Sequence, residues 1–136
     1  MDPELHELSR EECLELLDTH NVGRIALLTG AAPVIVTVNY RLTGTRGLTQ
    51  IALRTRFGGV IERSSPEVAF EIDQVDDDTR TGWSVLVRGT LHHLDPEAAN
   101  FDARFDSETW LTDRDAWMII QPYSIEGRKL TQPAGA

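Results

Sequence analysis

The segment RTRFGG contains the residue types most suited to binding an anion. Arg54 and Thr55 end an apolar run, and Gly58 and Gly59 follow as a pair that leads into a predicted short helix. Backbone N–H groups of a glycine turn at a helix start bind anions, and arginine adds a fork of donors that suits phosphate. The segment therefore predicts a phosphate pocket. A solvated arginine cluster around a turn is the alternative.

Two other segments are candidate ligand contacts. Trp83 and Ser84 begin the apolar run GWSVLVRG, where the tryptophan is either a core residue or an apolar wall beside a planar ligand. Thr37 and Asn39 alternate with Val38, so the two polar side chains share the face opposite the apolar one. This face is either exposed to solvent or the lining of a cleft.

Other kinds of chemistry have little support in the sequence. His92 and His93 are adjacent in a predicted strand, so they point to opposite faces and cannot easily hold one metal ion. Cys13 is the single cysteine, and the G-x-S-x-G pattern of many hydrolases does not occur. The acidic stretch from Asp73 to Asp78 lacks calcium-loop spacing and reads as a solvated loop. We predict no metal site and assign no catalytic acid or base.

Hydrophobic periodicity predicts the elements that position these residues. Ser9 and Glu12 form a capping box for a helix over Arg10–Asp18. Further helices are expected over Gly59–Ser65 and Pro96–Phe105. Period-two or apolar runs predict six strands, at Val22–Thr29, Val34–Leu42, Leu48–Thr55, Glu67–Asp76, from Trp83 to about Leu91, and Trp117–Leu130.

These elements predict a mainly β fold, in which an antiparallel barrel, closed or nearly closed, carries flanking helices. An open sandwich is the alternative. The length of 136 residues fits one domain, 1–136.

Charge and cysteine content limit the partners and the compartment. The formal charge of −9 disfavours non-specific binding to nucleic acid and to anionic membranes. One cysteine fits a reducing compartment, and neither a secretory signal nor an apolar run of about 20 residues occurs. We therefore expect a cytoplasmic protein.

Six segments in order resemble the FMN-binding split-barrel superfamily, specifically the pyridoxamine 5'-phosphate oxidase-like proteins of actinobacteria. They are VGRIAL, PVIVTVNY, LRTRFG, EVAFEID, GWSVLVRG and EGRKL, and they span about Leu8 to Leu130. GWSVLVRG after an acidic loop is the most specific of them.

The resemblance implies a six-stranded split barrel and a homodimer with FMN in two clefts at the subunit interface. We expect an isologous interface of roughly 2,000 Å² or more. In relatives, positions matching Thr37, Val38 and Asn39 border the isoalloxazine. The remaining implied contacts are the phosphate ligands Arg54 and Thr55 with the Gly58–Gly59 turn, Ser84 and Trp83 near the flavin, and Arg128 reaching the partner's cleft.

One position departs from the family pattern. Relatives commonly carry a phosphate-binding lysine where this chain has Val60. Loss of such a charged contact costs on the order of 1.5–3 kcal/mol. The leading hypothesis is an FMN-dependent oxidoreductase with a small-molecule substrate. The alternatives are a deazaflavin-dependent reductase on the same barrel, and a non-catalytic protein that binds a flavin or another ligand, or no cofactor.

Overall fold

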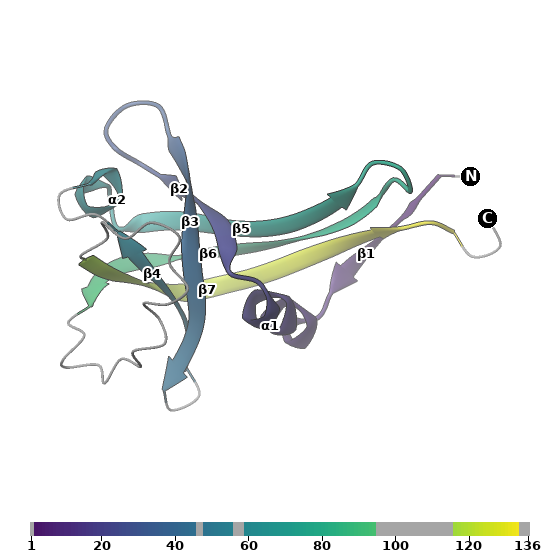
Figure 1. Ribbon diagram of the computed structural model, residues 1–136, viewed down its shortest axis with the longest axis horizontal. Coiled ribbons are helices and arrows are strands. Elements are labelled where there is room, and N and C mark those ends of the chain that lie inside the picture. Colours follow the sequence, from purple (N-terminus) through teal and green to yellow (C-terminus); the bar gives the residue numbers. More distant parts are fainter. Residues whose placement is uncertain (1, 46–47, 56–58, 95–115, 134–136) are drawn as a thin grey trace.

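The computed structural model describes residues 2–45, 48–55, 59–94 and 116–133, which form seven strands and two helices (Figure 1). In chain order these are β1 (Glu4–Leu8), α1 (Arg10–Thr19), β2 (Val22–Leu27), β3 (Val34–Thr45), β4 (Leu48–Thr55), α2 (Val60–Arg63), β5 (Glu67–Asp76), β6 (Thr81–Leu94) and β7 (Ala116–Thr131). The expected helix over Pro96–Phe105 lies outside the described residues.

The strands form one antiparallel sheet that closes into a ring. Its order is β1-β7-β4-β3-β2-β5-β6, and an additional pairing of β6 with β7 closes the barrel. The six predicted strands, β2 to β7, are the ring, so the mainly β split barrel is confirmed. β1 is a seventh strand that the sequence analysis did not predict, and it lies outside the ring against the end of β7.

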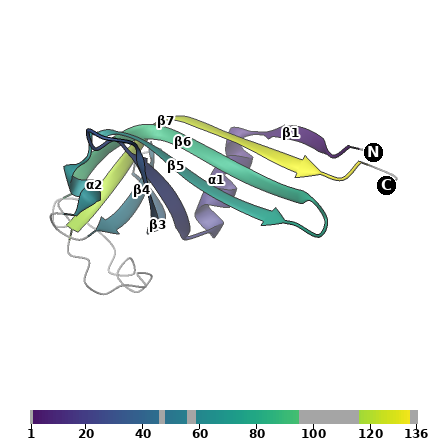
Figure 2. The ribbon, with the colours of Figure 1, turned by 90° about the horizontal axis from the view of Figure 1, so that it is seen from above.

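Beyond the ring, β5, β6 and β7 extend as an arm, and β1 runs along its edge (Figures 1 and 2). β5 pairs with β2 only from Val68 to Glu71, whereas it pairs with β6 as far as Asp76. β1 pairs with β7 from Gly127 to Thr131. The arm is therefore a four-stranded continuation of the barrel wall.

The core fills the barrel along the inner faces of β2 to β7. Phe70 and Ile72 of β5 are buried, and the ring of Phe70 meets Tyr40 of β3 edge to face, with 4.9 Å between centroids. The Tyr40 hydroxyl donates a 2.7 Å hydrogen bond to the carbonyl of Leu17, which joins the end of α1 to the barrel. Burial raises the pKa of this hydroxyl, so it stays a donor.

α1 begins with the predicted capping box. The Ser9 hydroxyl accepts from the backbone N–H of Glu12, and the Glu12 carboxylate accepts from the Ser9 N–H. Cys13 and Leu17 face the core and are fully buried. Burial raises the pKa of the Cys13 thiol, which therefore stays protonated and unreactive. The prediction of this helix is confirmed, with one more residue at its end.

Several predicted boundaries need correction. β2 ends at Leu27 instead of Thr29, and β3 continues to Thr45, three residues beyond its predicted end at Leu42. The helix predicted over Gly59–Ser65 is a single turn, Val60–Arg63. Within the described ranges, neither helix has the length and apolar character to cross a membrane.

Gly127 lets α1 approach the arm, which yields a stability prediction. A Cβ there would lie 2.7 Å from the Cys13 sulfur and 3.0 Å from a Leu8 methyl carbon. We expect Gly127→Ala to lower the free energy of unfolding by about 1–3 kcal/mol, because a packed site has no room for the methyl group. In a double-mutant cycle with Cys13→Ala, denaturant unfolding should show that the two substitutions together cost less stability than the sum of the two single substitutions. The reason is that Cys13→Ala removes the sulfur that the new methyl group meets. Additive effects would mean that α1 does not pack as described.

Candidate functional site

The candidate residues on β3 and β4 lie mostly on the outer face of the barrel. Val38 and Leu53 point inward and are buried, so their neighbours Thr37, Asn39 and Arg54 point outward. The structure thus confirms that the side chains of Thr37 and Asn39 lie on the face opposite Val38. Val38 reaches the outer face only through its backbone.

Asn39, Arg54 and Trp117, here called the barrel cluster, form one group of outward side chains. Arg54 pairs directly with Trp117 of β7, and its guanidinium carbon lies 5.8 Å from the centre of the indole ring. Tyr40 pairs with Leu53, which places Asn39 beside Arg54. The Asn39 Nδ2 and Arg54 Nε atoms are both buried. The cluster brings an amide, a guanidinium and an indole ring together. The sequence analysis did not assign Trp117 to a site.

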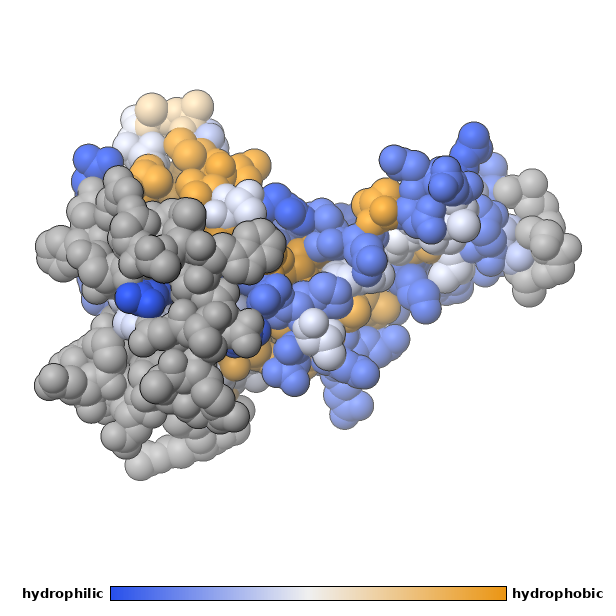
Figure 3. All heavy atoms as spheres, in the orientation of Figure 1, coloured by the Kyte–Doolittle hydropathy of each residue, from blue (hydrophilic) through white to orange (hydrophobic). Residues whose placement is uncertain are grey.

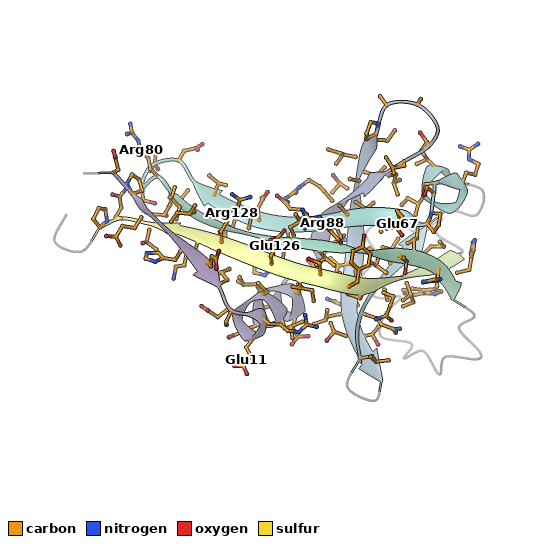
Figure 4. The ribbon with its side chains drawn as sticks, turned by 180° about the vertical axis from the view of Figure 1, so that it is seen from behind. Glu11, Glu67, Arg80, Arg88, Glu126 and Arg128 are labelled. Atoms are coloured by element: carbon orange, nitrogen blue, oxygen red, sulfur yellow. The ribbon has the colours of Figure 1, made fainter. Side chains whose placement is uncertain are left out.

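Ser84 and Arg128, here called the arm pair, lie directly opposite each other on β6 and β7. Both are on the outer face of the sheet, and Arg128 is exposed. Figure 4 shows Arg128, Glu126 and Arg88 in succession along this part of the molecule. Trp83 precedes Ser84 and so points to the inner face. The structure therefore does not place Trp83 and Ser84 on one surface.

One chain does not bring the barrel cluster and the arm pair together. The barrel cluster reaches β7 through Trp117, and Arg128 lies eleven residues further along that strand. Eleven residues of extended strand span roughly 35 Å. On the other side of the ring, β2, β5 and β6 separate β3 from the arm pair. Arg128 therefore does not reach a ligand held at Arg54 along this face.

An ion network occupies the outer face between the two groups. The Arg24 guanidinium lies 2.9 Å from a carboxylate oxygen of Glu71 and 2.9 Å from one of Asp73. Hydrogen bonding to Glu71 raises the pKa of Arg24. Burial and the neighbouring Asp73 raise the pKa of Glu71, although Arg24 opposes this. The sequence analysis missed the network, because its members are close only through strand pairing.

The glycine turn is described only in part. Gly59 caps α2 with extended backbone, and Val60 is partly buried against the core. An apolar contact thus accounts for valine at this position. Because α2 is a single turn, its helix dipole is small and contributes little to binding an anion at the start of the helix. Gly58 lies outside the described residues, and Thr55 ends β4.

Comparisons with known proteins place this fold in a family. The sequence model of the pyridoxamine 5'-phosphate oxidase family matches residues 9–129. The uncharacterized protein Rv0080 of Mycobacterium tuberculosis is 34% identical over 134 residues, covering 93% of this chain and 86% of that protein.

Two solved structures are similar in both fold and sequence. An FAD-binding protein from Mycobacterium smegmatis has a TM-score of 0.69 and 26% identity, covering 93% of this chain and 98% of its own. A candidate pyridoxamine 5'-phosphate oxidase from Corynebacterium glutamicum has a TM-score of 0.76 and 27% identity, covering 98% of both chains. The ring of six strands and the family match agree, and the chain belongs to the pyridoxamine 5'-phosphate oxidase family.

Proposed function

We propose that this protein is a flavin-binding oxidoreductase that holds FMN at the barrel cluster. The observation that carries the proposal is the group of donors formed by Asn39 and Arg54 beside the ring of Trp117. The name of the Mycobacterium smegmatis relative, an FAD-binding protein, supports a flavin. A bound flavin would supply the redox chemistry, while the protein binds and orients it.

The donor set fits a flavin phosphate. Arg54 offers a planar fork of N–H groups that can hold two phosphate oxygens, and its ring contact with Trp117 fixes the direction of the fork. The Asn39 amide and the exposed Thr37 hydroxyl can hydrogen-bond the polar edge of a flat ring. The sequence analysis adds Thr55, Gly58 and Gly59 to the proposed phosphate pocket.

Two copies of the chain are needed to complete the proposed site. Arg128 lies roughly 35 Å along β7 from Trp117 of the barrel cluster, so in the proposed site Arg128 and Ser84 reach a flavin from a second copy. Apolar side chains at the β2–β3 hairpin are also left uncovered: Ile35 is 70% exposed and Leu28 48% (Figure 3). We therefore propose a homodimer in which the arm pair of each copy contacts the partner's flavin.

A second candidate function is a binding protein without catalysis. Val60 packs against the core where relatives carry a phosphate-binding lysine, which weakens the anion pocket. The outer-face carboxylates Glu71 and Asp73 are occupied by Arg24. Such a protein would store or sense a flavin, and it would bind FMN without turning over a small-molecule substrate.

Removing the arginine should weaken flavin binding. We expect Arg54→Ala to raise the dissociation constant for FMN by about tenfold to a hundredfold, because a charge-assisted contact is lost. The effect should shrink as salt rises. The measurement is a titration followed by flavin fluorescence, repeated with FAD. Arg88→Ala is the matched control, since Arg88 pairs with Glu126 on the same outer face. Equal loss in both variants would mean that Arg54 has no special role.

Restoring the lysine should strengthen binding. We expect Val60→Lys to tighten FMN binding about fivefold or more, because an ammonium is added beside an anion. Since Val60 contacts the core, Val60→Met controls for the altered packing. The same titration measures both variants. If Val60→Lys is folded and binds FMN no better than Val60→Met, the phosphate does not lie at this turn.

The shared site can be tested by complementation. Arg54→Ala and Arg128→Ala homodimers should each bind FMN weakly, because each lacks one residue in both sites. After the two variants exchange subunits, mixed dimers have one intact site, and strong FMN binding should return in part. Sedimentation should give about twice the chain mass of 15.2 kDa. A monomer, or an Arg128→Ala protein with unchanged affinity, would contradict the shared site.

A further inference from the structure

The inner face of the arm carries a groove separate from the barrel cluster. A cavity of about 820 Å³ lies between the β5–β6 turn and the end of β7. A second, of about 270 Å³, lies between α1 and the arm. Trp83 and Lys129 line both cavities, so the two adjoin at these side chains and are together called the arm groove here. Its size suits a small organic molecule.

The floor of the arm groove is a row of side chains across three strands. Gln74, Trp83 and Lys129 are paired in sequence from β5 through β6 to β7, and all three line the first cavity. The row continues the inner face of the barrel, on which the neighbouring Val85 is fully buried. Beside α1, this face changes from aliphatic to aromatic and polar.

Trp83 is the aromatic centre of the arm groove. Its ring is half-buried and meets His20 edge to face, with 4.9 Å between centroids. This contact orients the indole relative to His20 at the end of α1. A half-exposed indole that lines a cavity can stack against a planar ligand, and its negative face attracts cations.

The charge of the arm groove is strongly negative. Its walls carry five carboxylates, and Lys129 is the one positive side chain among the lining residues. The carboxylates are Asp76, Asp77 and Asp78 at the β5–β6 turn, and Glu12 and Glu15 on α1. Hydrogen bonds to Ser9 lower the pKa of Glu12, and Lys129 adds to this effect, so Glu12 remains ionised at neutral pH.

We propose that the arm groove binds a small planar aromatic cation, of the class of N-alkylated heteroaromatic rings. Trp83 stacks against the ring, and the carboxylates attract the positive charge. An anion such as a flavin phosphate is repelled here, whereas Arg54 attracts it at the barrel cluster. The two sites therefore differ in the sign of the charge they select, and the arm groove requires no bound flavin.

Three probes of one shape separate charge from stacking. Isothermal titration calorimetry of the purified full chain would compare N-methylquinolinium, neutral quinoline and the anion quinaldate. We expect the cation to bind about tenfold more tightly than the neutral ring, since a cation over an indole and nearby carboxylates contribute together. The anion should bind weakest. Added salt should reduce the preference for the cation.

Variants locate the binding in the arm groove. Trp83→Leu should weaken binding of the cation and of the neutral ring, whereas Asp77→Asn/Asp78→Asn should weaken only the cation, about threefold or more. Asp76 is left intact because it accepts backbone hydrogen bonds from Asp78 and Thr79. Glu11→Gln is the matched control for Glu15→Gln, because Glu11 lies on the same helix but outside the groove lining (Figure 4).

Several outcomes would show that the arm groove does not bind an aromatic cation. Equal affinity for the three probes, or no detectable binding of any of them, overturns the proposal. So does unchanged binding of the cation in a folded Trp83→Leu variant, or equal loss in Glu11→Gln and Glu15→Gln. These readouts do not involve flavin, so failure of the flavin proposal leaves this test intact.

Discussion

The pairing of β6 with β7 is the interaction on which the rest of the structure depends. It runs from Gly82 opposite Leu130 to Leu94 opposite Trp117, and a single bulge near Arg88 and Gly89 shifts its register. One end closes the barrel, since β7 also pairs with β4 there, and the other end forms the arm. Such a bulge bends and twists the strands. The ring and the arm are therefore two ends of one pairing.

Alternation along these strands gives the two candidate sites opposite surroundings. Outward positions carry the barrel cluster and the arm pair, with arginine at Arg54 and Arg128. Inward positions on the arm carry Trp83 and Lys129, and the acidic walls of the arm groove come from the β5–β6 turn and α1. A protein with an overall charge of −9 thus has one surface that favours anions and another that favours cations. Net charge alone excludes broad partner classes and says little about a local pocket.

The sequence predicted best where one face of a strand is buried. The alternation from Val34 to Tyr40 and from Val68 to Ile72 identified the core faces, and the Ser9 capping box fixed the start of α1. β1 was missed because Glu4–Leu8 is an exposed edge strand without an apolar face, held by its pairing with β7. The Arg24 network and the distance between Arg54 and Arg128 depend on register around the ring, which no local pattern contains.

The visible absorption spectrum of the purified protein tests the central claim, flavin binding, most directly. Measured before and after incubation with FMN or FAD and removal of unbound ligand, it should show the near-ultraviolet and blue bands of an oxidised flavin that stays with the protein. Heating should then release a flavin, and chromatography would identify it as FMN or FAD. A colourless protein that retains neither flavin would contradict the account.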